Sequence, residues 1–159
     1  MGKKGKKGKG KGAKEAPPDP NILPTPVRTA LLNGDVKKVE DWLLTGGKVD
    51  AVNLALVPDR GLTLLMLAAR SGQEYFVDML LLRQASINLQ DTTGTTALMM
   101  AAGQGRASIM RRLLRSGANP RLGNFEGQGP MQCAQQSGDA TCVDLLKEVS
   151  LTQCPWPTA

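Results

Sequence analysis

A repeat of 33 residues constrains the fold of this chain more than any other feature of its sequence. Three sets of small residues share that spacing and one phase: Gly61, Gly94 and Gly127; Ala68, Ala101 and Ala134; Gly72, Gly105 and Gly138. A period of this length indicates one supersecondary unit copied along an axis, in which each copy buries its apolar face against its neighbours. The sequence therefore predicts a stacked repeat architecture.

Each copy is expected to hold two short helices, because apolar residues recur at helical spacing and glycines follow the predicted helix ends. The predicted helices are 27–33 and 36–44, 63–70 and 74–83, 96–102 and 107–116, with a fourth copy within 127–149. Residues 85–90 are expected to be extended. Thr63 and Thr96 open their helices, where a hydroxyl can cap the backbone amides of the first turn.

The first interval departs from the period, since Ala30 to Ala68 and Gly34 to Gly72 each span 38 residues. Loops accept insertions whereas stacked helices do not, so the five extra residues are expected in 50–58. This segment is predicted to be a longer and more mobile hairpin. Its apolar residues either pack back on the stack or meet a partner.

Composition favours an all-α fold and argues against an enzyme. Aromatic residues make up only 3% of the chain, so the core must be built from aliphatic residues, alanine and methionine, as in helix-on-helix packing. Histidine is absent, which removes the commonest general base and a common zinc ligand. Cys133 and Cys142 fall at apolar repeat positions and are expected to be small core residues, while Cys154 lies near the end of the sequence. No catalytic, cofactor or metal site is predicted.

The net charge of +6 belongs to the first residues of the chain. Residues 1–14 hold seven lysines and no acid, which leaves 13 basic against 14 acidic residues elsewhere. Five prolines follow within 16–26, so this part is expected to be a linker. The predicted organisation is a disordered tail at 1–25, a four-repeat domain at 26–149 (26–58, 59–90, 91–123 and 124–149) and a second tail at 150–159.

Three interpretations of the lysines from Lys3 to Lys14 stay open: a contact with nucleic acid, a nuclear import signal, or a solubilising tail. No apolar run approaches the ~20 residues needed to span a bilayer, and the lysine-rich start lacks the apolar region of a secretory signal. The expected location is intracellular, cytoplasmic or nuclear, with no membrane contact.

The repeat resembles the ankyrin repeat. In the third copy Asp91, Gly94, Thr96, Leu98 and the pair Ala101 and Ala102 stand where the family pattern places them, as do residues of its second helix. The resemblance covers about four fifths of the chain and implies a helix-turn-helix solenoid with short hairpin loops. The family's histidine is replaced by Met66, Met99 and Gln132. Gln84 replaces a helix-ending glycine, at a cost of about 1 kcal/mol if it adopts a left-handed backbone.

The resemblance also implies a function. Ankyrin-type stacks typically bind other proteins, as adaptors, scaffolds or inhibitors, along the hairpin tips and the concave surface of the first helices. Carried onto this chain, the candidate partner-binding residues are Arg60, Leu62, Arg70, Ser71, Thr92, Thr93, Thr95, Gln104, Phe125, Glu126, Gln128 and Gln136. Phe125 is the best anchor candidate, because an aromatic ring at a turn gains little unless a partner covers it. The alternative is that its ring folds back onto the C-terminal repeat. The identity of the partner and the oligomeric state are not encoded in these positions.

A basic run occupies the third copy, with Arg106, Arg111, Arg112, Arg115 and Arg121 and no acidic residue between Asp91 and Glu126. Such a run either is a solvated outer face or receives a phosphate, an acidic peptide or an RNA backbone. The absence of interleaved aromatic residues makes it a weak nucleic-acid signal. Arg112 stands at a position that is apolar in the family, which favours a specific role for it.

Overall fold

Eight helices form four consecutive helix-turn-helix pairs in the computed structural model, which describes residues 21–52 and 61–152, with side chains to Val149. The helices are α1 (Thr25–Asn33), α2 (Val36–Leu44), α3 (Leu64–Ser71), α4 (Glu74–Leu82), α5 (Ala97–Gly103), α6 (Ala107–Arg115), α7 (Pro130–Ser137) and α8 (Ala140–Thr152). In this part of the chain, β pairing is limited to isolated bridges of Val52 with Ile22 and Thr63. The all-α prediction is confirmed.

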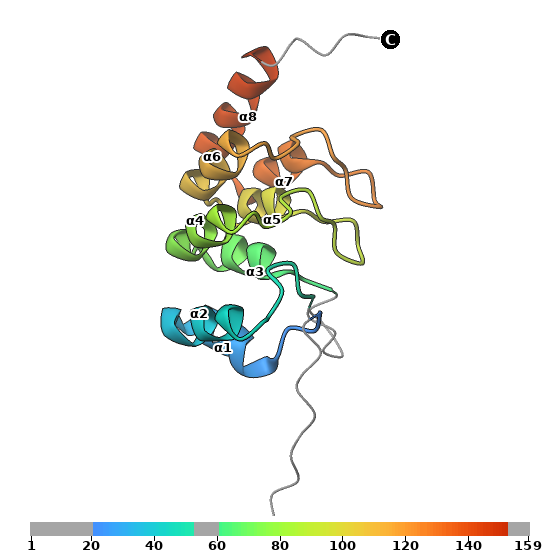
Figure 1. Ribbon diagram of the computed structural model, residues 1–159. Helices are drawn as coiled ribbons and strands as arrows, with labels where there is room; N and C mark the ends of the chain where they lie inside the picture. The colour runs from blue at the N-terminus through green and yellow to red at the C-terminus, as the bar shows by residue number, and fades with distance from the viewer. Residues whose placement is uncertain (1–20, 53–60, 153–159) are drawn as a thin grey trace, which may run out of the picture.

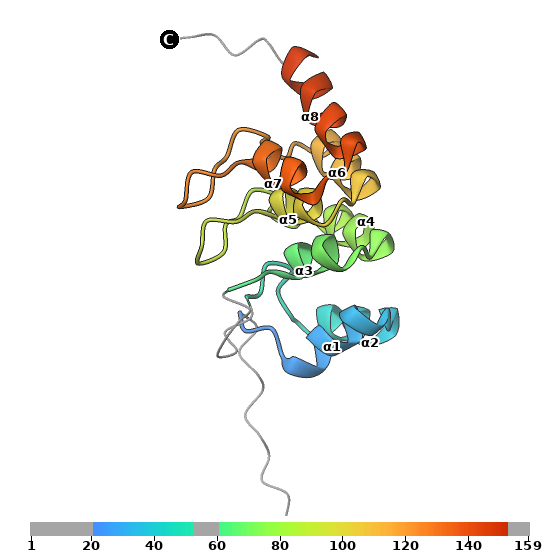
Figure 2. The same cartoon turned by 180° about the vertical axis from the view of Figure 1, so that it is seen from behind.

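The pairs stack in one direction and form a helical solenoid. The first helices α1, α3, α5 and α7 contact one another in one column, and α4, α6 and α8 do so in a second column (Figure 1). The loops that precede α5 and α7 project on the side of the first-helix column, as both views show (Figures 1 and 2). The stack therefore has a face of loops and first helices, and an opposite outer face built from the second helices.

Threonine caps the first helix of the two central pairs, as predicted. The Thr63 hydroxyl accepts a hydrogen bond from the Met66 amide, and the Thr96 hydroxyl accepts one from the Met99 amide, each at 3.3 Å. Each of these bonds satisfies one backbone amide that the helix itself leaves unpaired, and a cap of this kind typically stabilises a helix by about 1 kcal/mol. In the last pair, where Gly129 has no hydroxyl, its amide instead donates to the Gln132 side-chain oxygen at 3.0 Å.

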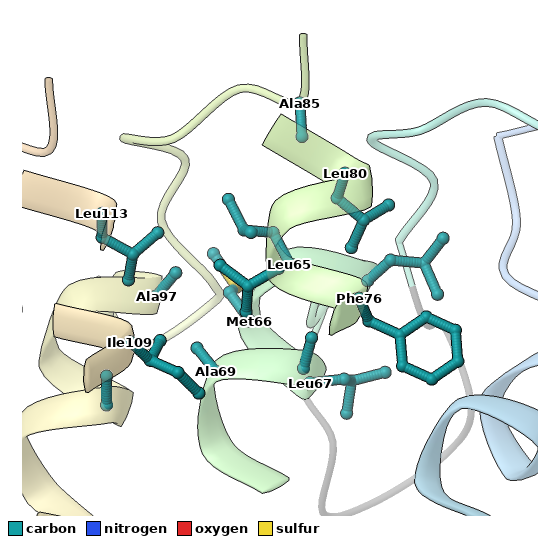
Figure 3. Packing of buried hydrophobic residues seen from close by; sticks show 14 of the residues in the cluster. Leu65, Met66, Leu67, Ala69, Phe76, Leu80, Ala85, Ala97, Ile109 and Leu113 are labelled. Atoms are coloured by element: carbon teal, nitrogen blue, oxygen red, sulfur yellow. The ribbon is translucent and has the colours of Figure 1, made fainter. Parts of the chain in front are cut away.

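The core lies between the two columns and consists mainly of aliphatic residues, with methionines and the ring of Phe76 among them (Figure 3). Ala68 and Ala69 of α3, and Ala101 and Ala102 of α5, are fully buried, and their small side chains let neighbouring first helices approach closely. Methionine fills the positions of the family's histidine, since Met66 and Met99 are both buried. Each of these methionine side chains is unbranched and flexible, so it fills apolar space without needing a polar partner.

Gln84 has a left-handed backbone, with φ of 61°. The equivalent positions in the neighbouring copies are Gly46 and Gly117, whose φ values are 104° and 95°. Among the described residues Gln84 is the one non-glycine residue with positive φ. Gln84 thus replaces a glycine at a position with a left-handed backbone, and this backbone conformation costs more free energy for glutamine than for glycine.

The start of the stack differs from the expected linker. Helix α1 begins at Thr25 and includes Pro26, because proline is tolerated in the first turn, where its missing amide has no intrahelical acceptor. Leu23 is buried, and its amide donates to the Val52 carbonyl at 3.0 Å. The start of α1 at Thr25 and the buried Leu23 thus lie before residue 26, where the predicted four-repeat domain begins.

Two other segments also differ from expectation. Residues 85–90 include a turn at Ile87 and Asn88 instead of running extended. Helix α8 continues to Thr152, past the expected domain end at 149. The insertion predicted at 50–58 lies mainly outside the described residues, as do the lysine-rich tail and Cys154.

Candidate functional site

The loop before α5 is held by its own aspartate. One carboxylate oxygen of Asp91 accepts hydrogen bonds from the Thr93 amide at 2.8 Å, the Thr93 hydroxyl at 2.7 Å and the Thr95 amide at 2.8 Å. The Thr93 and Thr95 hydroxyls also lie 2.9 Å apart. Both threonines are half-buried, so these two candidates shape the turn, whereas neighbouring Thr92 is exposed.

The loop before α7 repeats this arrangement with an amide side chain. The Asn124 side-chain oxygen accepts from the Glu126 amide at 3.0 Å and from the Gln128 amide at 2.8 Å. Gln128 is half-buried, whereas Glu126 is exposed. Asx-type bonding of this kind fixes a tight turn without a strand.

Phe125 sits on this loop with 76% of its surface exposed. Its amide donates to the Thr93 carbonyl at 3.0 Å, which ties the two loops together. Its ring lies against Gly94, where an added Cβ would come within 2.9 Å of the Phe125 Cδ1 atom. The ring therefore leans on the preceding loop, so the alternative in which it covers the C-terminal repeat does not describe this structure.

Two residues that the sequence analysis did not single out join the repeats behind these loops. The Gln90 side-chain amide donates to the Gly94 carbonyl at 2.8 Å and to the Gly123 carbonyl at 3.0 Å. The Asn88 side chain accepts from the Asn119 amide at 2.9 Å and donates to the Gly117 carbonyl at 3.3 Å. Both are polar residues in the connection between α4 and α5, and that position is the sequence signal that could have indicated this bridging role.

The candidates on and near the first helices divide by burial. Leu62 is only 2% exposed and belongs to the core, so it does not contribute to an exposed surface. Ser71 is half-buried and donates to the Leu67 carbonyl at 2.7 Å, and Arg70 is also half-buried. Gln104 and Gln136 are exposed. Arg60 lies outside the described residues.

The exposed candidates on the loop and first-helix side define what we call the inner surface. Its members are Thr92, Gln104, Phe125, Glu126 and Gln136. Most are polar and uncharged, and one aromatic ring stands among them on a loop that is fixed by hydrogen bonds. This combination suits recognition of another macromolecule, because an ordered ring loses little conformational freedom when a partner covers it.

The basic run lies on and beside α6, and one member differs from the rest. Arg112 contacts two carboxylates of α4, with its Nη2 atom 2.8 Å from Glu74 and its Nη1 atom paired with Asp78. Arg106, Arg111, Arg115 and Arg121 are exposed. The polar residue at an apolar family position is therefore explained by a bridge between the second helices of neighbouring pairs.

Hydrogen bonding in this bridge shifts the pKa values of Glu74 and Arg112. The Ser108 hydroxyl, followed in importance by the Arg112 guanidinium, holds the pKa of Glu74 below its ordinary value. The Asp78 carboxylate, together with Glu74, raises the pKa of Arg112. Glu74 and Asp78 are spaced i, i+4 on α4 and so face the same side, which lets one guanidinium reach both.

Neither described cysteine has the surroundings of a nucleophile. Cys142 is fully buried, and burial, assisted by the nearby Asp139 carboxylate, raises the pKa of its thiol to about 11. Burial also raises the pKa of Cys133, which is half-buried. Both thiols are therefore protonated at neutral pH, when the thiolate is the reactive form. The core role expected of Cys142 is confirmed, and Cys133 packs at the edge of the core.

Residues 21–52 and 61–152 lack two further features. No cluster of three or more potential metal ligands occurs in that part of the chain. None of its helices combines the length and apolar character required to traverse a bilayer.

Comparison with known proteins agrees with the repeat pattern. A family model described as ankyrin repeats, in three copies, matches residues 65–153. The matched region begins in α3 and takes in the loops that carry Phe125 and Asp91. A search among curated proteins found no match for this chain.

Proposed function

Because the chain belongs to the ankyrin repeat family, whose repeats are generally protein–protein interaction modules, we propose that it is a non-enzymatic adaptor, scaffold or inhibitor that binds a protein through its inner surface. The observation that carries this proposal is the 76% exposed ring of Phe125 on a loop held by Asn124 and tied to Thr93. Aromatic anchors with fixed surroundings are typical of interface hot spots. Gln104, the residue that follows α5, and Gln136 of α7 are exposed and supply further polar contacts on this surface.

The proposal is tested by quantitative affinity purification from lysate with the full chain as bait. Phe125→Ala should lower recovery of specific partners by at least about tenfold, as expected for loss of a hot-spot ring. Gln104→Arg should lower recovery of the same proteins, because it adds an unmatched charge to the interface.

Arg111→Ala is the matched control, since Arg111 is exposed on the opposite, outer face. Equal recovery by the original chain and both inner-surface variants would refute binding through this surface. Circular dichroism of each variant checks that the helices remain intact.

A second candidate function rests on the separate observation that residues 1–14 concentrate seven lysines without an acid. In this alternative, the chain is a nuclear or nucleic-acid-associated factor in which Lys3 to Lys14 contact phosphates and the stack binds a protein. Retention on immobilised RNA or DNA should fall steeply with salt and should be lost when residues 1–14 are deleted. Retention that persists after the deletion would exclude this use of the lysines.

A further inference from the structure

The outer face carries large apolar side chains that the packing of the repeats leaves uncovered. Leu44 and Leu82 are the last residues of α2 and α4 and are 76% and 85% exposed. They occupy the same repeat position, because they are separated by the 38-residue first interval. Tyr75, one of the first residues of α4, is 57% exposed. These residues belong to the second-helix column, away from the loops of the inner surface (Figure 1).

Two grooves flank Leu82. A groove of about 440 Å³ lies between α2 and α4, and its lining residues are Glu40, Tyr75, Asp78, Met79, Leu82 and Arg83. A groove of about 510 Å³ lies between α4 and α6. Its lining residues are Asp78, Leu81, Leu82, Arg112, Arg115 and Ser116. Leu82 is thus a ridge shared by both depressions, a position from which it can contact a ligand that crosses the helices.

The charged residues that line the two grooves differ, and this difference favours one orientation of a ligand on the outer face. In the groove between α4 and α6, Asp78 is already neutralised by Arg112, which leaves Arg115 as an exposed cation beside Leu82. The groove between α2 and α4 is lined by two carboxylates, Glu40 and Asp78, and by one cation, Arg83, so it has no excess of positive charge. An acidic group is therefore favoured on the α6 side of Leu82, and an apolar group on the α2 side.

We propose that the outer face binds an acidic amphipathic helix of a partner protein, with its apolar residues over Leu44, Tyr75 and Leu82 and its acidic end over Arg115. The occupant is a helix because the backbone amides and carbonyls of α2, α4 and α6 are hydrogen-bonded within each helix, so the face has no strand edge with which an extended peptide could pair. An extended peptide would leave its own backbone unpaired on such a surface, whereas a helix satisfies its backbone by itself.

The spacing of the column suits this ligand. Helices that pack directly, as α4 and α6 do, lie about 8–10 Å apart, and seven residues of an α-helix rise about 10.5 Å. Leu44, Leu82 and Arg115 end three successive second helices. A helix that crosses them along the column would place an acidic residue about seven positions after the apolar residue over Leu82, with further apolar residues toward Leu44 at its other end. This site is separate from the inner surface and does not depend on Phe125.

The test uses a displayed library of helical peptides of about 21 residues, long enough to cross three helices, with one face randomised. Selection on the full chain should enrich leucine or phenylalanine at one end of that face, and aspartate or glutamate at the other. For a selected peptide, Leu82→Glu should weaken binding by at least about tenfold in fluorescence anisotropy. Arg115→Glu should also weaken it, and should restore affinity for a peptide whose acids are changed to lysine.

Phe125→Ala should leave peptide binding unchanged, which separates this proposal from the one for the inner surface. Selected peptides without acidic enrichment, or with affinity that is indifferent to Leu82→Glu, would overturn the proposal. The alternative occupant is a second copy of this chain, and sedimentation equilibrium tests it. If the original chain forms a dimer that Leu82→Glu dissociates, the outer face is a dimer interface, and this result would also overturn the proposal.

Discussion

The junction between the first and second helix pairs is built differently from the junction between the second and third. At the second junction the outer helices are joined by polar contacts, since Arg112 and Ser108 of α6 bond to Glu74 of α4. At the first junction the outer helices are separated by the groove that Glu40 lines, and a buried aromatic ring lies between the two pairs. Figure 3 shows that ring, Phe76, pointing toward the helices of the first pair.

The residues at matching repeat positions explain this difference. Phe76 and Ile109 are 33 residues apart and are both buried, so the first junction has the larger apolar filler. Glu74 and Asp78 of α4 pair with Arg112 on the α6 side. A repeat stack can therefore join neighbouring copies by apolar volume or by charge, and a groove remains on the outer face at both junctions.

The largest effect is expected from the apolar filler of the first junction. Phe76→Ala should lower the free energy of unfolding by about 3–5 kcal/mol, because it removes a buried ring and leaves a cavity. Leu82→Ala, on the same helix but 85% exposed, should change it by no more than about 0.5 kcal/mol. Urea unfolding of both variants would measure the contrast, and equal effects would mean that the Phe76 ring does not support this junction.

A smaller effect of opposite sign is expected at the strained helix end of the second pair. Gln84→Gly should raise the free energy of unfolding by about 0.5–1 kcal/mol, since glycine adopts the left-handed backbone without penalty. Gly117→Gln at the equivalent position should lower it by a similar amount, about 1 kcal/mol. Thermal unfolding compares the two variants. A destabilised Gln84→Gly would show that the glutamine side chain makes a contact that outweighs the strain.

Arg112→Gln tests whether charge holds the second junction. The denaturation midpoint should fall, but by less than in Phe76→Ala, because all three charged side chains are partly exposed. The loss should shrink in about 1 M salt, where the screening length is about 3 Å. Arg111→Gln, exposed on the same helix, should leave the midpoint unchanged. A loss that salt does not reduce would point to packing of the arginine stem instead.

The smallest effect is expected in the acid range. The pKa of Glu74 is lower in the folded chain than in the unfolded chain, so the unfolded chain binds more protons as the pH falls. The contribution of Glu74 should be complete above about pH 5 and should be lost as the pH falls through its ordinary pKa near 4.3 toward the lower folded value. Glu74→Gln should flatten this part of the stability profile. An acid limb identical to that of the original chain would contradict the assignment.

Much of the fold followed from local sequence signals. The 33-residue period, the threonine caps and the glycine stops predicted six helices within about two residues, because those signals act within one turn of a helix. The sequence also singled out Gln84 in place of a helix-ending glycine, and this residue does have a left-handed backbone. Leu23 was missed because its burial depends on Val52, which lies across the first pair and leaves no periodic trace.

The candidate site was less predictable than the fold. Repeat position placed Phe125 on a loop, but its lean toward Gly94 and its bond to Thr93 depend on how the loops stack. Leu62 was assigned to the surface because of its repeat position, but it is buried. The family pattern specifies where a residue lies within one copy and does not specify which neighbouring side chains pack over it.

The sequence by itself determined the repeat, the helix pairs, the aliphatic core and the position of the off-pattern residues, since each depends on spacing along one copy. Only the tertiary structure decided what those residues touch. Arg112 meets Glu74 and Asp78, and Leu82 stands between two grooves, because stacking brings together side chains that are more than 30 residues apart. Periodicity fixes the direction of a side chain from its own helix, whereas its partner is fixed by the distance and offset of the neighbouring copy.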